Sequence, residues 1–185
     1  MCTQTRMRRR GFTLVEILAV LVIIGIASAI VVPHLGTRDD LRCAAAARIA
    51  VADLIYAQNV AISTQKTVYV KFDVTNKNYT LLSTAATGGD VAMTNPLTQQ
   101  TYTQIFGSAS KGLETVNLGS AVFDGIDPNY TNCFTIAFDE MGAPYAFSYS
   151  QSNKNDLKDG TIVLTSGSFS TTITVSPYTG EIKVQ

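Results

Sequence analysis

The sequence predicts an α+β fold, in which a long N-terminal helix precedes and packs on an antiparallel β domain. Three observations support this prediction. Residues 12–32 hold seventeen Ala, Val, Ile, Leu or Phe among twenty-one positions. Apolar residues then recur at helical spacing from Leu41 to about Ile62. From Thr67 onward, short segments alternate with a period of two, which is typical of strands.

Composition excludes several classes of protein. The 185 residues suit one domain with an appendage. Net charge is zero, and charged residues make up 15% of the chain, against about 25% in an average soluble domain. No basic surface for nucleic acid is therefore evident. One histidine and three cysteines are too few for a His/Cys zinc cluster or a disulfide scaffold.

The first thirty-three residues have the order of a membrane anchor. Four arginines and no acid precede the apolar run, and positive flanks stay in the cytoplasm. As a helix, Phe12–Val32 would be about 31 Å long, which matches the hydrocarbon core of a bilayer. We therefore expect a single span with the N-terminus cytoplasmic and everything after Pro33 extracytoplasmic.

Two general interpretations of this segment are a plain anchor and a Sec signal peptide. The second has support, because Ala27-Ser28-Ala29 has the small-x-small form of a signal peptidase site. Glu16 argues against both. A charge near mid-membrane costs on the order of 2.5–3.5 kcal/mol, and neither an anchor nor a secretory segment has a use for it.

The residues around Glu16 carry a resemblance. Arg10-Gly11-Phe12-Thr13-Leu14-Val15-Glu16 resembles the type IV prepilin and pseudopilin signature. The resemblance implies that a prepilin peptidase cuts between Gly11 and Phe12 on the cytoplasmic face and methylates Phe12. It places Glu16 at the family's glutamate position, the fifth residue of the mature chain. Pro33 falls where many type IV pilins have a proline that kinks the stem helix.

Physical chemistry gives Glu16 a role that agrees with this resemblance. A buried charge needs a partner. The protonated N-terminus of a neighbouring subunit would supply one. Glu16 is therefore expected to set subunit register during assembly.

A second helical segment follows the bend or break expected at Pro33. Thr37, Asp39 or Asp40 is the expected N-cap. We expect one apolar stripe to pack on the sheet, formed by Leu41, Ala45, Ile49, Ala52, Ile55, Tyr56 and Ile62. Arg48 and Asn59 interrupt that stripe, so Arg48 is a candidate contact with a neighbouring subunit.

The remainder is expected to be an antiparallel β domain. Thr67–Val74 and Tyr79–Ser83 predict a hairpin around a Thr-Asn-Lys-Asn turn. Residues 84–120 are less readable, although a structureless loop of that length would be unusual. The other expected strands are Val116–Leu118, Ala121–Phe123, Cys133–Phe138, Tyr145–Tyr149, Thr161–Thr165, Thr171–Ser176 and Glu181–Val184.

The C-terminal half extends the resemblance. Phe138-Asp139-Glu140-Met141-Gly142-Ala143-Pro144 and Ser176-Pro177-Tyr178-Thr179-Gly180 are similar to the ending of the GspH/FimT-like pseudopilin family. The resemblance implies four parts: a cleaved leader (1–11), a transmembrane stem (12–33), an amphipathic second half of the stem (34–62) and a periplasmic β head (63–185). Residues 84–130 do not match convincingly.

Enzymatic and metal chemistry find no support in the sequence. His34 is the only histidine, which excludes arrangements that need more than one, and it follows Pro33 at the expected membrane edge, where we expect an interfacial residue. No phosphate-binding glycine motif occurs. Asp124, Asp127 and the Asn/Asp run at 153–159 could offer oxygen ligands to calcium, but neither cluster has EF-hand spacing. We therefore expect no catalysis, no metal and no cofactor.

Cysteine and charge leave two further questions. Cys43 and Cys133 are permitted to pair in an oxidising compartment, or to remain two small apolar residues, and the sequence does not decide between these states. Residues 34–185 carry ten Lys or Arg against thirteen Asp or Glu, which argues against nucleic acid binding without excluding a local patch.

The resemblance implies a minor pseudopilin of the H type in a type II protein secretion system. Such a subunit would lie in the bacterial inner membrane and then in a periplasmic pseudopilus. Its partners would be the prepilin peptidase, other pseudopilins and the inner-membrane assembly platform. The alternatives are a minor type IV pilin in pilus assembly, adhesion or DNA uptake, and a Sec-exported β domain that binds a ligand.

Overall fold

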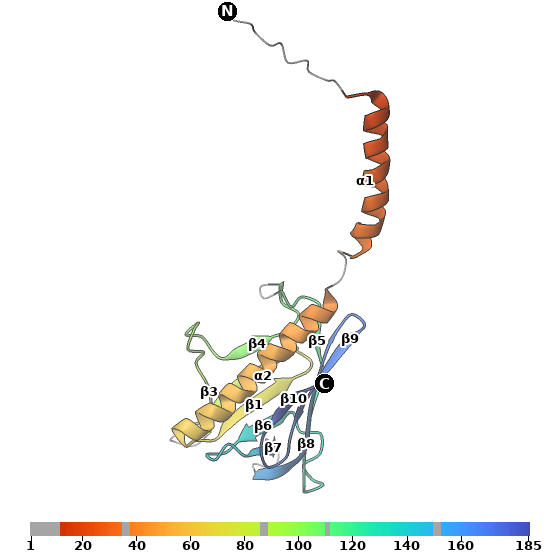
Figure 1. Cartoon of the computed structure of the whole chain (residues 1–185). Helices are drawn as coiled ribbons and strands as arrows, with labels where there is room; N and C mark the ends of the chain where they lie inside the picture. Colours follow the sequence, from red (N-terminus) through yellow and green to blue (C-terminus); the bar gives the residue numbers. More distant parts are fainter. Residues whose placement is uncertain (1–11, 35–37, 86–88, 110–111, 150–152) are drawn as a thin grey trace, which may run out of the picture. The chain divides into compact units, whose positions relative to one another are not determined.

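The computed structural model describes residues 12–34, 38–85, 89–109, 112–149 and 153–185, with the backbone alone for residues 30–34. The chain divides into two compact units, one ending at Arg38 and the other spanning Asp39–Gln185. Figure 1 shows an isolated helix followed by a helix that lies against strands. Each unit is described below by itself.

The first unit contains helix α1 (Leu14–His34). Thr13 caps its start, because the Thr13 hydroxyl accepts a hydrogen bond from the Glu16 N–H at 3.2 Å. The helix runs through Pro33 and ends one residue later. Residues 35–37 lie outside the described residues, so the predicted kink at Pro33 stays a prediction.

The second unit begins with helix α2 (Asp39–Thr64), close to the predicted limits. Its C-terminal end is marked by Gln65, which has a φ of 50°, and by a Lys66 N–H to Ala61 carbonyl bond of 3.3 Å. A residue in the left-handed region is a common way to end a helix.

The predicted packing stripe of α2 is wrong. The stripe residues Leu41, Ile55 and Ile62 are exposed, at 59%, 43% and 43%. The face that packs on the sheet lies on the opposite side of the helix and is small, consisting of Asp39, Cys43, Ala46, Ala47, Ala50, Leu54, Ala57 and Ala61. Alanine side chains are small, so they allow the helix backbone to approach the sheet closely. The buried face of α2 is therefore the face with the smallest side chains and not the face with the most hydrophobic ones.

The strands form one antiparallel system whose path runs β10-β9-β8-β7-β6-β1-β2-β3. The predicted hairpin is confirmed as β1 (Val68–Asp73) and β2 (Asn78–Thr84), paired from Val68 opposite Ser83 to Asp73 opposite Asn78. β6 (Thr135–Phe138) joins the free edge of β1, and β7 (Pro144–Ser148) joins β6.

A second group of strands continues from β7. The long strand β8 (Asn153–Ser166) pairs with β7 through its first half and with β9 (Phe169–Val175) through its second. β5 (Val116–Gly125) pairs along β8, and β10 (Ile182–Val184) closes the edge beside β9.

Several strand expectations need correction. The two strands expected at 116–118 and 121–123 are one strand, β5, with a register shift between Leu118 and Ser120. Gly119 lies in this shift, where an added Cβ would be 3.3 Å from the Val163 carbonyl oxygen. Within 84–120 the chain also forms β3 (Asp90–Ala92) and β4 (Thr103–Ile105), both paired with β2.

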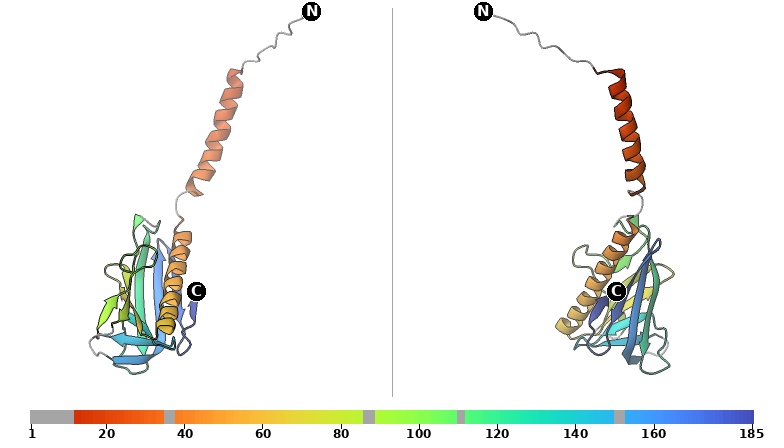
Figure 2. Two further views of the ribbon diagram at one scale, coloured as in Figure 1. Left: turned by 90° about the vertical axis from the view of Figure 1, so that its left-hand side faces the viewer. Right: turned by 45° about the vertical axis from the view of Figure 1, so that its right-hand side comes forward.

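The hydrophobic core lies between α2 and the strands. Figure 2 shows α2 lying along one side of the strands. Core side chains come from the helix and from both strand groups; the largest fully buried ones include Tyr79, Phe123, Phe138, Leu54 and Ile162. The predicted α+β architecture is confirmed.

Candidate functional site

The N-terminal end of α1 holds the residues that the sequence singled out. Gly11 lies outside the described residues. Phe12 is 78% exposed, and Glu16 is an exposed acid in the first helical turn. The positive end of the helix dipole favours an acid there. Thr13 and Glu16 also have the spacing of a capping box, so the new N-terminus after Gly11 would lie one residue before a stable helix start.

Helix α1 presents an apolar surface on every side. All its described side chains, from Leu14 to Ala29, are exposed. The exposed set includes Ile17, Leu21, Val22, Ile23 and Ile26. A helix that is apolar all round is stable only inside a membrane or against other apolar helices. This surface is consistent with a membrane anchor.

Among the described residues, helix α2 is the one helix long and apolar enough, by length and composition alone, to cross a membrane, and the apolar stretch Leu14–Ala29 of α1 is shorter. The alanine face of α2, however, is covered by the sheet, and the helix carries Asp40, Arg42, Arg48 and Asp53. Charges at this density are costly in a bilayer. We therefore assign α2 to the core of the second unit.

A polar network fixes the start of α2 to the strands. Asp39 is 8% exposed, and its Oδ1 accepts hydrogen bonds from the Thr115 hydroxyl at 2.9 Å and the Ser166 hydroxyl at 3.3 Å. Arg42 bonds Glu114 at 2.7 Å and lies 3.8 Å from Asp39. This network holds the first turn of α2 against the start of β5 and the end of β8.

Gly167, in the turn after β8, leaves room for that network. Its φ is +58°, and an added Cβ would lie 2.5 Å from an Asp39 carboxylate oxygen. A side chain there would push the carboxylate away from the two hydroxyls. Sequence reasoning treated Asp39 only as a cap candidate and missed this contact, since nothing in the sequence pairs residue 39 with residues 115 and 166.

A second network joins the middle of α2 to β2. Asp53 accepts hydrogen bonds from the Tyr79 hydroxyl at 2.6 Å and from the Tyr102 hydroxyl at 2.9 Å. Burial, together with the nearby Asp53 charge, raises the pKa of Tyr79 well above its usual 10.0. Burial and the Asp53 hydrogen bond also raise the pKa of Tyr102. Both phenols therefore stay protonated donors at physiological pH.

Two cysteines lie in the part of the chain that the structure describes, Cys43 and Cys133, and both are free and buried. The Cys43 thiol donates to the Leu164 carbonyl at 3.4 Å and lies 3.3 Å from the Thr171 hydroxyl. Burial raises the pKa of the Cys133 thiol, and so does the nearby Asp124 carboxylate. Each cysteine thus fills a separate part of the core.

The candidate calcium ligands make local turn contacts. Asp124 accepts the Asn132 N–H at 2.7 Å, and Asp127 accepts the Asn129 N–H at 2.9 Å. Among the described residues, no group of three His, Cys, Asp or Glu is placed to hold a metal ion. Turn geometry accounts for these acids.

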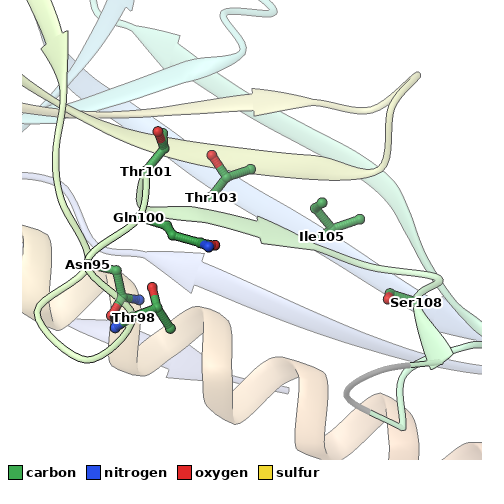
Figure 3. Close-up of a pocket in the computed structure, with 7 residues that line it drawn as sticks. All are labelled: Asn95, Thr98, Gln100, Thr101, Thr103, Ile105 and Ser108. Carbon is green, nitrogen blue, oxygen red and sulfur yellow. Dashed lines mark hydrogen bonds between the residues drawn. The ribbon is translucent and has the colours of Figure 1, made fainter.

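The head carries a polar hollow of about 200 Å³ beside β4 (Figure 3). Hydroxyl and amide side chains dominate its lining, which consists of Asn95, Thr98, Gln100, Thr101, Thr103, Ile105 and Ser108. The Asn95 carboxamide closes the turn at its rim by accepting the Leu97 N–H at 2.9 Å. Among the described residues that line this hollow there is no acid, histidine, lysine or thiol.

Comparisons with known proteins agree with the geometry of α1. The family model described as "Prokaryotic N-terminal methylation motif" matches residues 6–32. That range includes Gly11, Phe12 and Glu16. A comparison with curated protein sequences finds no match.

Solved structures resemble most of the chain in fold. Two structures of the minor pseudopilin EpsH from the type II secretion system of Vibrio cholerae are 14% and 13% identical to it, with TM-scores of 0.51 and 0.52. They cover 78% and 80% of this chain, and 96% and 95% of their own. At this identity the likeness establishes the fold.

The type IV minor pilin FimU of Pseudomonas aeruginosa is 14% identical, with a TM-score of 0.47, over 77% of this chain and 87% of its own. The N-terminal methylation motif and the EpsH-like fold agree with the resemblance expected from the sequence.

Proposed function

We propose that this chain, which has the N-terminal methylation motif and the fold of type IV pilins and pseudopilins, is an H-type minor pseudopilin of a type II protein secretion system. Pilins and pseudopilins are structural, non-enzymatic proteins, and the chain's chemistry is consistent with that role. The observation that carries the proposal is the combination of the motif at residues 6–32 with a fold like that of EpsH over most of both chains.

The proposed steps of processing, membrane anchoring and assembly follow from the two units of the chain. The motif implies processing by a prepilin peptidase, which removes 1–11 and methylates Phe12. The apolar helix α1 then holds the chain in the inner membrane, with the head in the periplasm. An assembly platform extracts it into a pseudopilus, where α1 helices of neighbouring subunits pack together.

Glu16 has a specific task in this proposal. It lies four residues after the proposed new N-terminus, in a helix whose other described side chains up to Ala29 carry no charge. A carboxylate in that surrounding is stabilised by the positive N-terminus of a neighbouring subunit. Because only one axial position brings the two charges together, the pair sets subunit register.

The test is secretion of a known type II substrate in the host that carries this gene. Deletion of the gene should leave the substrate in the periplasm. The intact gene should restore secretion, and a Gly11→Ala variant expressed at the same level should not. Normal secretion after deletion would overturn the proposal, and loss of twitching or transformation in the same strain would then assign the chain to a type IV pilus.

A further inference from the structure

The face of α2 that points away from the strands is exposed along the whole helix. Its residues recur at helical spacing, and they are Leu41, Ala45, Arg48, Ala52, Ile55, Asn59 and Ile62. Three of them have large aliphatic side chains, and six of the seven carry no charge. An extended row of exposed aliphatic side chains is typical of a surface that another protein covers. We call these seven residues the open face of α2.

Arg48 is the single charged residue of the open face. Its guanidinium has no hydrogen-bond or ion-pair partner among the described residues. The other acids of the exposed helix surface are not available to it, because Asp53 accepts two tyrosine hydroxyls and Asp40 lies two turns away. A partner without an acid would bury the guanidinium unpaired, which is costly. The partner of this face should therefore be apolar and carry one carboxylate.

Helix α1 has this chemistry. Its described side chains, which end at Ala29, are exposed, and Glu16 is the single charged residue among them. One face of α1 consists of Glu16, Val20, Ile23 and Ala27, because these residues recur at helical spacing. The intervals along this face are four, three and four residues, which are also the intervals between Arg48, Ala52, Ile55 and Asn59 on α2.

The equal intervals define a register between two parallel helices. With Glu16 beside Arg48, Ile23 lies level with Ile55, and the two faces stay together for eleven residues, about 16 Å. An antiparallel arrangement through the same charges would carry α1 past Asp39, where α2 begins, and would leave Ile55 uncovered. The parallel register is therefore the one that covers both the charge and the aliphatic side chains.

A second α2 would be a poorer occupant of this face. Two open faces packed against each other would bring two Arg48 side chains together and no acid, and like charges at an interface are unfavourable. Charge complementarity thus favours α1, whose face supplies the missing carboxylate.

We propose that the open face of α2 binds helix α1 of a second copy of this chain, in parallel, with Glu16 against Arg48. The inference rests on the proposed function, because α1 leaves the membrane only in a filament. A carboxylate has two oxygens that each accept hydrogen bonds. Contact with Arg48 of one neighbour is therefore compatible with contact between Glu16 and the N-terminus of another.

The test is a disulfide between two copies in filaments sheared from the host. One tagged copy carries Ile23→Cys and a second, with a different tag, carries Ile55→Cys. Mild oxidation should link the two copies, and the link should disappear on reduction. Leu21→Cys in place of Ile23→Cys should give no link, because Leu21 lies on the opposite side of α1. Tagged copies without added cysteines control for the native thiols.

The charge pair is tested by variants of Arg48. Arg48→Gln should lower severalfold both the chain recovered in filaments and the yield of the disulfide, and Arg48→Lys should keep both. In a Glu16→Gln chain, Arg48→Gln should cause no further loss, because the pair is already broken. Arg38→Gln removes an exposed arginine that precedes α2, and it should assemble as the parent chain does.

The outcomes separate this inference from the proposed function. Filaments that contain the chain, but give no Ile23–Ile55 link or tolerate Arg48→Gln, would overturn the inference and leave the proposed function standing. A link formed by Ala52→Cys alone would also overturn it, since it would place a second α2 on this face. A processed chain that never enters filaments would refute the proposed function and the inference with it.

Discussion

Asp39 and Asp40 are neighbouring acids in the first turn of α2 with opposite surroundings. Asp39 is buried against two hydroxyls, and Asp40 is exposed. Asp39→Ala removes those hydrogen bonds and one of the two carboxylates near Arg42, and should lower the free energy of unfolding by about 1–3 kcal/mol. Asp40→Ala should change it by less than about 0.5 kcal/mol. Thermal unfolding of both variants, followed by circular dichroism, checks this; equal melting temperatures would contradict it.

Glu16 should matter in assembly and nowhere earlier. Glu16→Ala removes a charge from an apolar helix, so membrane insertion and leader cleavage should proceed as in the parent chain. The fraction of the chain recovered in sheared filaments should fall severalfold, because the register contact is lost. Val20→Ala keeps the helix apolar and should assemble normally. Full incorporation of the Glu16→Ala protein would rule out the register role.

Buried tyrosines should make the head sensitive to alkali. The pKa of Tyr79, Tyr102, Tyr145 and Tyr149 is raised in the folded chain, chiefly by burial. The stability they contribute is fully present below pH 10.0, the ordinary tyrosine value. Above it the unfolded chain releases phenolic protons that the folded chain retains, so the free energy of unfolding falls as pH rises.

The measurement is the melting temperature between about pH 8 and pH 11. Tyr79→Phe should lower the melting temperature at the lower end of this pH range, because the hydrogen bond to Asp53 is lost. The melting temperature of this variant should then fall less steeply with rising pH than that of the parent chain. Tyr178→Phe changes a phenol that is 71% exposed and should keep the parent slope. An unchanged slope in Tyr79→Phe would contradict the assignment.

Residues within short motifs could be predicted from the sequence, and residues that meet across the fold could not. Gly11, Phe12 and Glu16 lie within seven consecutive positions, so their pattern is local. Asp39 meets Thr115 and Ser166 only because β5 and β8 pair. The contact between the Tyr69 and Phe147 rings likewise depends on the strand order β7-β6-β1.

Helix α2 illustrates the same limit at the scale of an element. Its existence and extent follow from alanine content and from the absence of Gly and Pro, but its buried face does not. Both faces carry apolar residues at helical spacing, and hydrophobicity favours the face of Leu41, Ile55 and Ile62. The sheet instead accepts the face of small residues, leaving the larger aliphatic residues exposed.

The two faces of α2 should respond differently to added volume. Ala57 is fully buried against the strands, and Ala52 is exposed. Ala57→Leu overpacks the interface and should lower the free energy of unfolding by about 1–3 kcal/mol. Ala52→Leu adds the same atoms to the open face and should have an effect below about 0.5 kcal/mol. Melting curves of the two variants decide; the reverse order would mean that the helix is rotated.

Strands with alternating apolar residues were predictable, and strands built from polar residues were not. β1 and β2 alternate clearly around a tight turn. The first half of β8 reads Asn-Lys-Asn-Asp, a composition typical of turns, yet it pairs with β7 from Ser148 opposite Asn153 to Tyr145 opposite Asp156. Tertiary pairing overrides local preference there, as it does for the short strands β3 and β4.

At the scale of the whole molecule, the two units have different roles. The first unit supplies an apolar helix that needs a membrane or other helices, and the second supplies a packed head with its own core. Such a division suits a subunit that is stored in a bilayer and then moved into a filament. The secretion assay addresses the destination of that filament.

The intact mass of the chain purified from host membranes tests the central claim, that this is a processed pilin-like subunit. We predict a chain that lacks residues 1–11 and carries one methyl group on Phe12, and a Gly11→Ala variant that keeps its leader. A mature chain that begins at Ile30 would indicate cleavage by signal peptidase. An unprocessed chain that begins at Met1 would equally contradict the account.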